Sequence, residues 1–443
     1  MQNKKLKIVI LFAALGIFNA YTYAQPSDSI KNDRFSVHYQ ATIINQFKPS
    51  FAAKYSGMNS LGTNEESQTS ITSTLFAGAR LWKGASVFIN PEIAGGSGLS
   101  GALGVAAATN GETFRIGDPA PQIYVARIFF RQIFSLAQKT DYQATDFNQL
   151  GEHLPQKYLS FTIGKVGIVD YFDDNQYSHD PRTQFMSWAL MANGAWDYPA
   201  NTRGYTPSVV LEYVSPEHEL RYGFSLVPMT ANGSSMNWNF ADAHSQTVEY
   251  THRHKIRHQE GAIRLLAFRT MTNMGNYRKS IDLNPINPII ENTRQKGNYK
   301  YGFAVNAEQD ISKDLGLFFR ASWNNGATET WAFTEIDRSV SAGLSWTGQH
   351  WKRANDNVGL AFVSSGLSKP HRSYLAAGGK GFILGDGGLN YAPEYLTEAY
   401  YSAELVKKYV YLSGTYQLVV NPGYNKDRQG PVSVFSLRLN ARI

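Results

Sequence analysis

Apolar and polar residues alternate along the segment 431–443, PVSVFSLRLNARI. Because a β-strand points successive side chains to opposite faces, this segment predicts a strand with one apolar and one polar face. The apolar face carries Ser433, Phe435, Leu437, Leu439, Ala441 and Ile443. The other face carries Val432, Val434, Ser436, Arg438, Asn440 and Arg442. Such a strand fits a membrane-spanning β-barrel, with lipid outside and a watery lumen inside, or the last strand of a soluble sandwich, with Arg438 and Arg442 in solvent.

The same period of two residues recurs through most of the chain. It is found in segments 35–43, 73–81, 87–93, 220–226, 299–308, 315–324 and 412–420. No linker, charge run or change in composition separates them, so residues 25–443 are predicted to form one domain. A soluble sandwich of this length would normally divide, whereas a barrel grows by adding hairpins. At about ten residues per strand, we expect an all-β fold, a transmembrane antiparallel β-barrel of about 16 strands with long loops.

Two segments break the alternation. Residues 93–111 are rich in Gly and Ala and predict a long loop. Residues 180–194, DPRTQFMSWALMANG, predict a short helix that Asp180 caps and that ends at Gly194. We expect this helix to belong to a loop and to fill part of the lumen; a surface helix is the alternative.

The amino end predicts a signal peptide over residues 1–24. Three lysines precede an apolar stretch at 8–17, and small residues in 22–24 precede a cleavage point at Gln25. The apolar stretch is too short to cross a bilayer as a helix. The mature chain is therefore expected to be exported.

Composition narrows the class of protein further. Aromatic residues make up 13% of the chain, which suits the two aromatic girdles of a membrane barrel. The chain has no Cys, which excludes disulfides, thiol nucleophiles and Cys-ligated metals. Without the three lysines of the predicted signal peptide, 39 basic residues face 35 acidic ones, and the net charge falls from +7 to +4. That small excess gives no indication of nucleic-acid binding.

No motif indicates an enzyme or a resident cofactor. The match to GxGxxG at 96–101 lacks the parallel βαβ unit that a nucleotide site needs. His252, His254 and His258 could ligate a metal, but the Arg and Lys residues among them oppose a divalent cation. Neither GxSxG nor HExxH occurs. We therefore expect no catalytic residues, no cofactor and no metal.

Ionisable residues on the predicted inward strand faces form the candidate site, a pore constriction. They are Arg80, Glu92, Arg127, Arg131, Glu249, Glu308, Arg320 and Glu398. Guanidinium and carboxylate groups that face each other across a narrow lumen can replace the water around a polyol, and their binding must stay weak for flux. An Arg on the lipid face near the midplane would cost about 2–4 kcal/mol, which favours the lumen for the four arginines. The alternative is that these side chains only brace the barrel wall.

Arg127 and Arg131 are the ambiguous members of this set. Along segment 124–134 they have the same parity as Val125 and Ile133, so alternation alone leaves the inward face of this strand open. If the four arginines all face the lumen, their charge should bias the pore toward anions.

Several motifs resemble those of the carbohydrate-selective porins of Gram-negative outer membranes, the OprB type. They are NPE at 90–92 with NGE at 110–112, RIFFRQ at 127–132, IGK at 163–165 with DYFDDN at 170–175, HDPRTQF at 179–185, WDYPA at 196–200, NAEQ at 306–309, RASWNNG at 320–326, Trp351 with DNVGLA at 356–361, EAYYSAEL at 398–405 and NPGYNKDRQGPV at 421–432. The resemblance runs through nearly all of the predicted mature chain.

The resemblance implies a barrel of about 16 strands in the cell outer membrane, through which mono- and oligosaccharides diffuse passively. It also implies Arg and Glu residues at the constriction. The expected partners are sugars as transported solutes, outer-membrane lipid and the barrel-assembly machinery, with a homo-oligomer left open and no nucleic acid. One feature departs from the pattern, because such barrels commonly end in an aromatic residue and this chain ends in Ile443.

The sequence leaves three alternatives to a sugar-conducting porin. A general or anion-preferring porin would use the same fold with a different constriction. An outer-membrane hydrolase would need a nucleophile arrangement that the sequence does not display. A secreted sugar-binding β protein would be found outside the membrane fraction.

Overall fold

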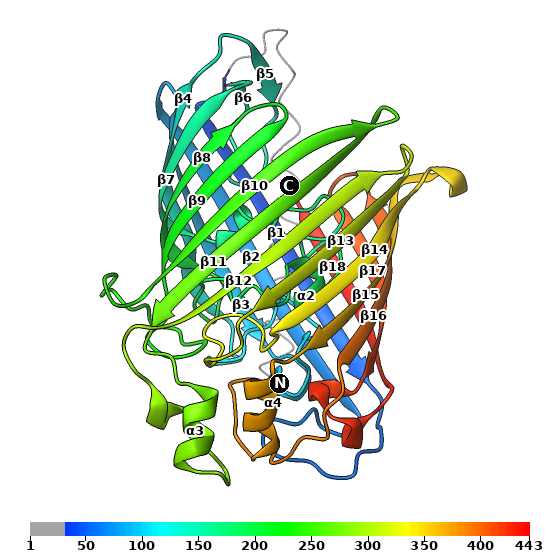
Figure 1. Cartoon of the computed structure of the whole chain (residues 1–443). Helices are drawn as coiled ribbons and strands as arrows, with labels where there is room; N and C mark the ends of the chain where they lie inside the picture. The colour runs from blue at the N-terminus through cyan, green and yellow to red at the C-terminus, as the bar shows by residue number, and fades with distance from the viewer. Residues whose placement is uncertain (1–31) are drawn as a thin grey trace.

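Sixteen antiparallel strands close into a β-barrel in the computed structural model of this chain, which describes residues 32–443 (Figure 1). The barrel strands are β1 (Phe35–Lys48), β2 (Glu66–Trp82), β3 (Ala85–Gly96), β4 (Gln122–Ser135), β7 (Tyr158–Val166), β8 (Thr206–Val214), β9 (His218–Leu226), β10 (His244–Ile256), β11 (Gln259–Thr272), β12 (Asn298–Asp310), β13 (Leu315–Asn324), β14 (Arg338–Gly348), β15 (Arg353–Gly366), β16 (Glu394–Val406), β17 (Val410–Val420) and β18 (Val432–Arg442). A separate two-stranded sheet pairs β5 (Thr140–Gln143) with β6 (Glu152–Pro155). The predicted signal peptide at 1–24 lies outside the described residues.

The helices of the described chain are short. They are α2 (Trp188–Met191), α3 (Tyr277–Leu283) and α4 (Lys369–Ala376), with 3₁₀ turns at Leu99–Gly101, Ile168–Asp170, Ile290–Thr293, Gln349–Trp351, Pro422–Tyr424 and Lys426–Arg428. Within residues 32–443, no helix has both the length and the apolar character needed to cross a membrane.

The first and last strands close the barrel. β1 pairs with β18 in a register that joins Gln40 to Arg442 and Phe47 to Phe435. Every other strand pairs with its neighbours in the chain, except that β4 skips the small sheet and pairs with β7. Closure leaves no strand edge unpaired, which a sheet in lipid requires. The prediction of a single closed barrel of about 16 strands is confirmed.

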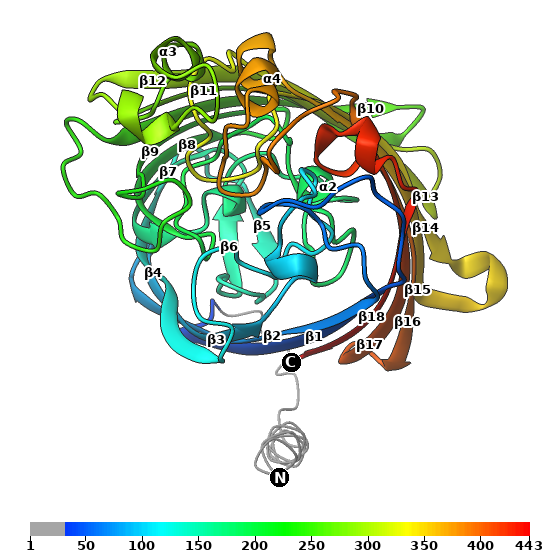
Figure 2. The same ribbon diagram turned by 90° about the horizontal axis from the view of Figure 1, so that it is seen from below.

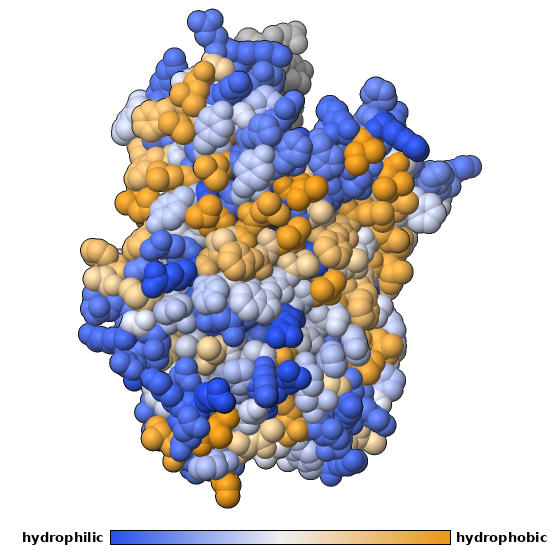
Figure 3. Space-filling model, in the orientation of Figure 1, coloured by the Kyte–Doolittle hydropathy of each residue, from blue (hydrophilic) through white to orange (hydrophobic). Residues whose placement is uncertain are grey.

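The two faces of the strands have the polarity that the alternation predicts. In β18, Val434 and Arg438 are fully buried toward the lumen, whereas Phe435 is 48% and Leu437 56% exposed on the outside. The same holds in β2, where Leu75 lies outside and is 40% exposed. Figure 3 shows the result as a band of hydrophobic residues across the outer face, with polar residues at both ends. This band is the surface that meets lipid.

A β-bulge resolves the ambiguous strand. In the pairing of β3 with β4, Asn90 lies opposite Arg127, but the next residue, Pro91, lies opposite Val125, so Ala126 has no partner. One extra residue reverses the parity of a strand. As a result Val125 faces outward, 39% exposed, while Arg127 on the other side of the bulge faces inward.

Single cysteines can test this reversal, because the chain has no other Cys. We expect Arg127→Cys to react with water-soluble thiol reagents, and Ile128→Cys and Val125→Cys to react only with lipid-soluble ones. Labelling of Val125→Cys by the water-soluble reagent at the rate of Arg127→Cys would place the bulge elsewhere.

The connections at the two ends of the barrel differ greatly in length. At one end, eight connections have 11 to 39 residues, and at the other, six turns have two to four residues. The exception at the short-turn end is the connection 136–157, whose 22 residues carry β5 and β6. Outer-membrane barrels keep short turns on the periplasmic side and long loops outside, so connection 136–157 lies at the periplasmic end, at the top of Figure 1.

The long connection 167–205 between β7 and β8 folds into the lumen together with part of the connection 97–121, as the view along the barrel shows (Figure 2). From Phe185 to Ala200 every residue of the inward connection is buried. The predicted lumen helix is present, but both predicted bounds are wrong, since α2 covers only Trp188–Met191 and not residues 180–194. α2 begins only after Ser187, because the N–H groups of Met186 and Ser187 donate to the Glu398 carboxylate instead of continuing a helix.

Candidate pore constriction

Three wall carboxylates hold the inward connection 167–205 by its backbone. Glu249 on β10 accepts from the Asp173 N–H at 2.7 Å, and Glu308 on β12 accepts from the Gln176 N–H at 2.6 Å. Glu398 on β16 accepts from two successive N–H groups, 2.6 and 3.0 Å away. Hydrogen bonds from backbone N–H groups to a carboxylate are charge-assisted and therefore strong. These three residues of the predicted site thus fasten the connection to the wall.

Asp173 is a further attachment of the connection and contacts the wall through its side chain. Its carboxylate accepts from Arg320 Nε on β13 at 3.2 Å and from Asn306 Nδ2 on β12 at 2.7 Å. Arg320 also donates to the Leu190 carbonyl at 2.8 Å. Both members of the ion pair are only 1% exposed. Arg320 is therefore enclosed between the wall and the connection.

Arg182 of the inward connection forms the centre of an ion-pair cluster inside the lumen. Its guanidinium pairs with Glu92 of β3 at 3.0 Å and with Glu112 of the connection 97–121 at 2.9 Å, and it also reaches Thr74 of β2 at 3.0 Å. A residue from one loop thus bridges a carboxylate of the wall and a carboxylate of another loop. We call the region around Glu92, Glu112 and Arg182 the waist.

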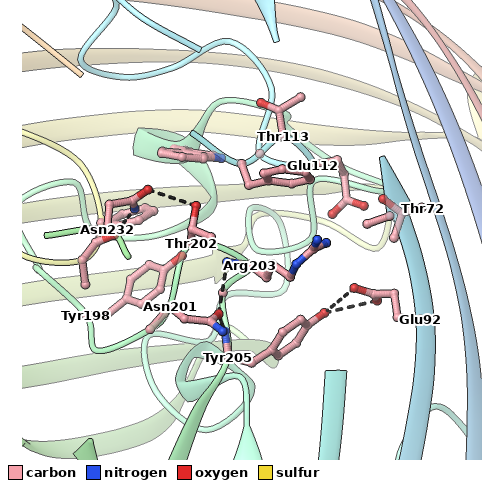
Figure 4. A pocket seen from close by; sticks show the side chains of 18 of the residues that line it. Thr72, Glu92, Glu112, Thr113, Tyr198, Asn201, Thr202, Arg203, Tyr205 and Asn232 are labelled. Atoms are coloured by element: carbon pink, nitrogen blue, oxygen red, sulfur yellow. Dashed lines mark hydrogen bonds between the residues drawn. The ribbon is translucent and has the colours of Figure 1, made fainter. Parts of the chain in front are cut away.

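Two tyrosines complete the shell around the Glu92 carboxylate. Tyr205 donates to it at 3.0 Å, as Figure 4 shows, and Tyr124 of β4 donates to the same oxygen. The Arg203 guanidinium lies 4.2 Å from the centre of the Tyr124 ring, and that of Arg127 lies 4.9 Å from the Tyr205 ring. The waist therefore combines stacked guanidinium and phenol planes with polar groups at their edges.

Arg127 and the other two arginines of β2 and β4 each have an acidic partner. Arg127 donates two hydrogen bonds to Asp170, at 2.6 and 2.7 Å. Arg80 and Arg131 both pair with Glu152, at 2.6 and 3.7 Å. These two arginines lie toward the periplasmic end and do not reach the waist.

Burial and charge act together on the two loop residues of the waist. Burial raises the pKa of the Glu112 carboxyl, and the charge of Arg182 acts in the opposite direction. Burial also lowers the pKa of Arg182, but the carboxylates of Glu112 and Glu92 outweigh it and raise that pKa well above its usual range. Arg182 therefore remains a cation, and its positive charge is a fixed feature of the waist.

Two cavities meet at the waist. One, of about 90 Å³, lies toward the long loops, and the other, of about 460 Å³, lies toward the periplasmic end. Both are lined by Gly111, Glu112, Arg182, Tyr198, Arg203, Gly204 and Tyr205. Below we call the larger cavity the inner chamber. A solute that crosses the barrel by this route passes these shared residues.

The eight residues chosen from the sequence thus fall into separate groups. Glu92 lies at the waist, Arg127 and Arg131 line the inner chamber, and Arg80 lies near its periplasmic edge. The other four are Glu249, Glu308, Arg320 and Glu398, which hold the inward connection. Sequence reasoning missed Glu112, Arg182, Arg203 and the two tyrosines of the waist, although HDPRTQF and NGE were among the recognised motifs.

No three His, Asp or Glu side chains in the described part of the chain are arranged to hold a metal ion. A closed barrel with an apolar outer band and ion pairs across its lumen defines an outer-membrane porin. A model of the carbohydrate-selective porin, OprB family, matches residues 58–442, and the chain belongs to this family.

Solved structures show the same fold at low sequence identity. The high-pH structure of Pseudomonas putida OprB is 14% identical, with a TM-score of 0.68, over 93% of this chain and 94% of that chain. The outer membrane channel DcaP of Acinetobacter baumannii is 10% identical, with a TM-score of 0.51, over 95% of this chain and 100% of that chain. A search of curated proteins found no match.

Proposed function

We propose that neutral sugars diffuse passively through the waist of this outer-membrane porin, with Arg182, Glu92 and Glu112 exchanging hydrogen bonds with their hydroxyl groups. One observation carries the proposal: a guanidinium lies between two carboxylates, beside phenol rings. Sugars need both donors and acceptors at the edges of their rings and apolar surface at their C–H faces. The waist offers both within one narrow passage.

The charges around the passage support neutral solutes over the anion-preferring alternative. The two cavities are lined by four acidic residues and four arginines. They are Glu92, Glu112, Asp170, Asp180, Arg127, Arg131, Arg182 and Arg203. An even balance of fixed charge gives little net field along the axis, so ions gain little selectivity while polyols keep their hydrogen-bond partners.

The residues predicted from the sequence divide by role in this proposal. Glu92 acts on the solute at the waist, and Arg127 and Arg131 act on it in the inner chamber. Glu249, Glu308, Arg320 and Glu398 are positioning residues, since they contact the inward connection.

The family and the fold point to a channel rather than an enzyme, and we propose that the protein has no hydrolytic activity. Insertion by the barrel-assembly machinery and a homo-oligomeric state stay predictions.

Sugar titration against ion current in a planar bilayer tests the proposal. We expect purified protein to open pores whose current falls as glucose or maltose is added, because a sugar at the waist displaces water and ions. Pores whose current responds to neither sugar at high millimolar concentration would remove the carbohydrate assignment. They would leave the porin fold unaffected.

A further inference from the structure

The connection 136–157 is the single long one at the periplasmic end of the described barrel, and it folds back into the lumen. Figure 1 shows β5 and β6 at that end, and Figure 2, viewed along the barrel, shows them inside its outline. The turn between these two strands, residues 144–151, includes Phe147, Asn148 and Gln149, and all three line the inner chamber. The chamber is thus bounded by the waist on one side and by this turn on the other.

Four tethers hold the turn inside the barrel. Leu150 is fully buried against Phe88 and Phe129 of the wall. The Asn148 side chain accepts a hydrogen bond from Asn90 at 2.8 Å. The third tether is Glu152, just beyond the turn, which pairs with Arg80 and Arg131. The fourth is a backbone hydrogen bond, in which the Asp33 N–H donates to the Gly151 carbonyl at 2.6 Å. Tethers of such different kinds indicate a fixed element rather than a mobile loop.

Phe147 is the aromatic member of the turn. Its ring stacks on Phe76 of β2 with a centroid distance of 4.4 Å and an interplanar angle of 18°. His38 contacts the same ring edge-on at 5.9 Å. Phe147 is half-buried and lines the chamber, so these contacts fix its orientation while leaving it partly accessible.

Two side chains of the chamber wall, Gln40 and Arg131, each keep one donor atom without a partner. Gln40 is only 3% exposed, and its Nε2 donor has no hydrogen-bond partner among the described residues; the same is true of Arg131 Nε. Unpaired buried donors are rare and costly. Both residues line the chamber, and its volume of about 460 Å³ falls in the range of pockets that enclose a small molecule.

We propose that the inner chamber is a second saccharide subsite and that the turn 144–151 is its exit filter, with the Phe147 ring as the surface for a sugar C–H face. The inference rests on the proposed function, because it concerns the same permeating solute. It adds a second point of selection, at which the size of the saccharide matters more than at an open periplasmic mouth. The sugar enters the chamber through the waist, and its rate of exit past the turn depends on the length of the saccharide.

The test compares Phe147→Ala, Phe147→Leu and a variant whose residues 136–157 are replaced by Asn-Gly, the two-residue turn that suits a hairpin. Tyr142→Ala is the matched control, because Tyr142 belongs to the same connection but is 44% exposed and lies away from the chamber. Leu keeps the apolar packing on Phe76 and removes only the aromatic face. Heat-modifiable migration on gels identifies the folded channels used.

Two measurements are made on each folded channel: the swelling rate of liposomes in glucose, maltose and maltotriose, and the block of ion current by maltose added from either side. We expect Phe147→Ala and Phe147→Leu to weaken the block about two- to tenfold, the range of one aromatic contact. We also expect Phe147→Ala and the Asn-Gly variant to raise the maltotriose-to-glucose swelling ratio at least twofold. Tyr142→Ala should behave as wild type.

The outcomes separate the inference from the proposed function. If the wild-type channel is blocked by maltose and all three variants keep its block and its swelling ratio, the turn is no filter and the inference is wrong. If Tyr142→Ala changes the ratio as much as Phe147→Ala, the effect comes from general loosening, and the assignment of Phe147 is also wrong. A wild-type channel that ignores all three sugars contradicts the proposed function itself.

Discussion

Channels carrying Arg182→Ala should prefer cations over anions and should lose most of their block by sugars. The change removes the single cation between Glu92 and Glu112 and leaves two carboxylates facing the waist. It also removes the central donor for sugar hydroxyls. A hydrogen bond to a charged group contributes about 1.5–3 kcal/mol, so the block should weaken about tenfold or more. The reversal potential in a KCl gradient measures the selectivity, and maltose titration measures the block.

Arg269→Ala is the matched control for this experiment. Arg269 lies on the outer face of β11, against Tyr299, and its loss leaves the lumen unchanged. It should therefore keep the wild-type selectivity and block. An Arg182→Ala channel with an unchanged reversal potential would show that ions pass by a route other than the waist.

A second large effect is expected for Asp173→Ala. This change leaves Arg320 buried without its partner and also deletes the acceptor for Asn193 and Asn306. Breaking one side of a buried ion pair costs about 3–5 kcal/mol. We expect the inward connection 167–205 to loosen next to Arg320 on β13, so that single-channel conductance rises and sugar block becomes weak.

Asp174→Ala provides the control at the neighbouring position. The Asp174 side chain is 53% exposed and lies 3.9 Å from its nearest partner, Arg264, so its removal should change neither conductance nor block. The two variants are compared by single-channel recording and by the temperature at which the folded gel band disappears. Equal conductance for Asp173→Ala and wild type would mean that the carboxylates of Glu249, Glu308 and Glu398 hold the connection without it.

The strands of the barrel could be predicted because their environment is simple. Each barrel strand has lipid on one side and a polar lumen on the other, so a period of two residues is enough to assign its faces, as in β2 and β18. The pattern was ambiguous in β4, where the geometry departs from this rule. The bulge at Ala126 changes which residues of β4 face the lumen, from even-numbered before it to odd-numbered after it. The alternation of residues in this segment does not predict that bulge.

The waist was harder to predict because half of it comes from loops. Glu92 was found since it lies on a strand with regular alternation, whereas Arg182 and Glu112 lie in irregular connections that have no period to read. Arg182 and Glu112 come into contact only because two connections that are far apart in the sequence both fold into the lumen. The bonds from Glu398 to Met186 and Ser187 could not be predicted for the same reason, because the alternation places a carboxylate inward without showing which group it meets there.

The wall carboxylates bind the backbone of the inward connection, so most side chains of this connection can vary between related channels without loss of these bonds. Glu249, Glu308 and Glu398 accept from main-chain N–H groups, which every residue except proline supplies. Substitutions at Gln176 or Met186 therefore leave these anchors intact. Apart from Asp173, whose side chain is itself an anchor, the side chains of the connection can therefore change to suit a new solute while the barrel wall that holds the connection stays the same.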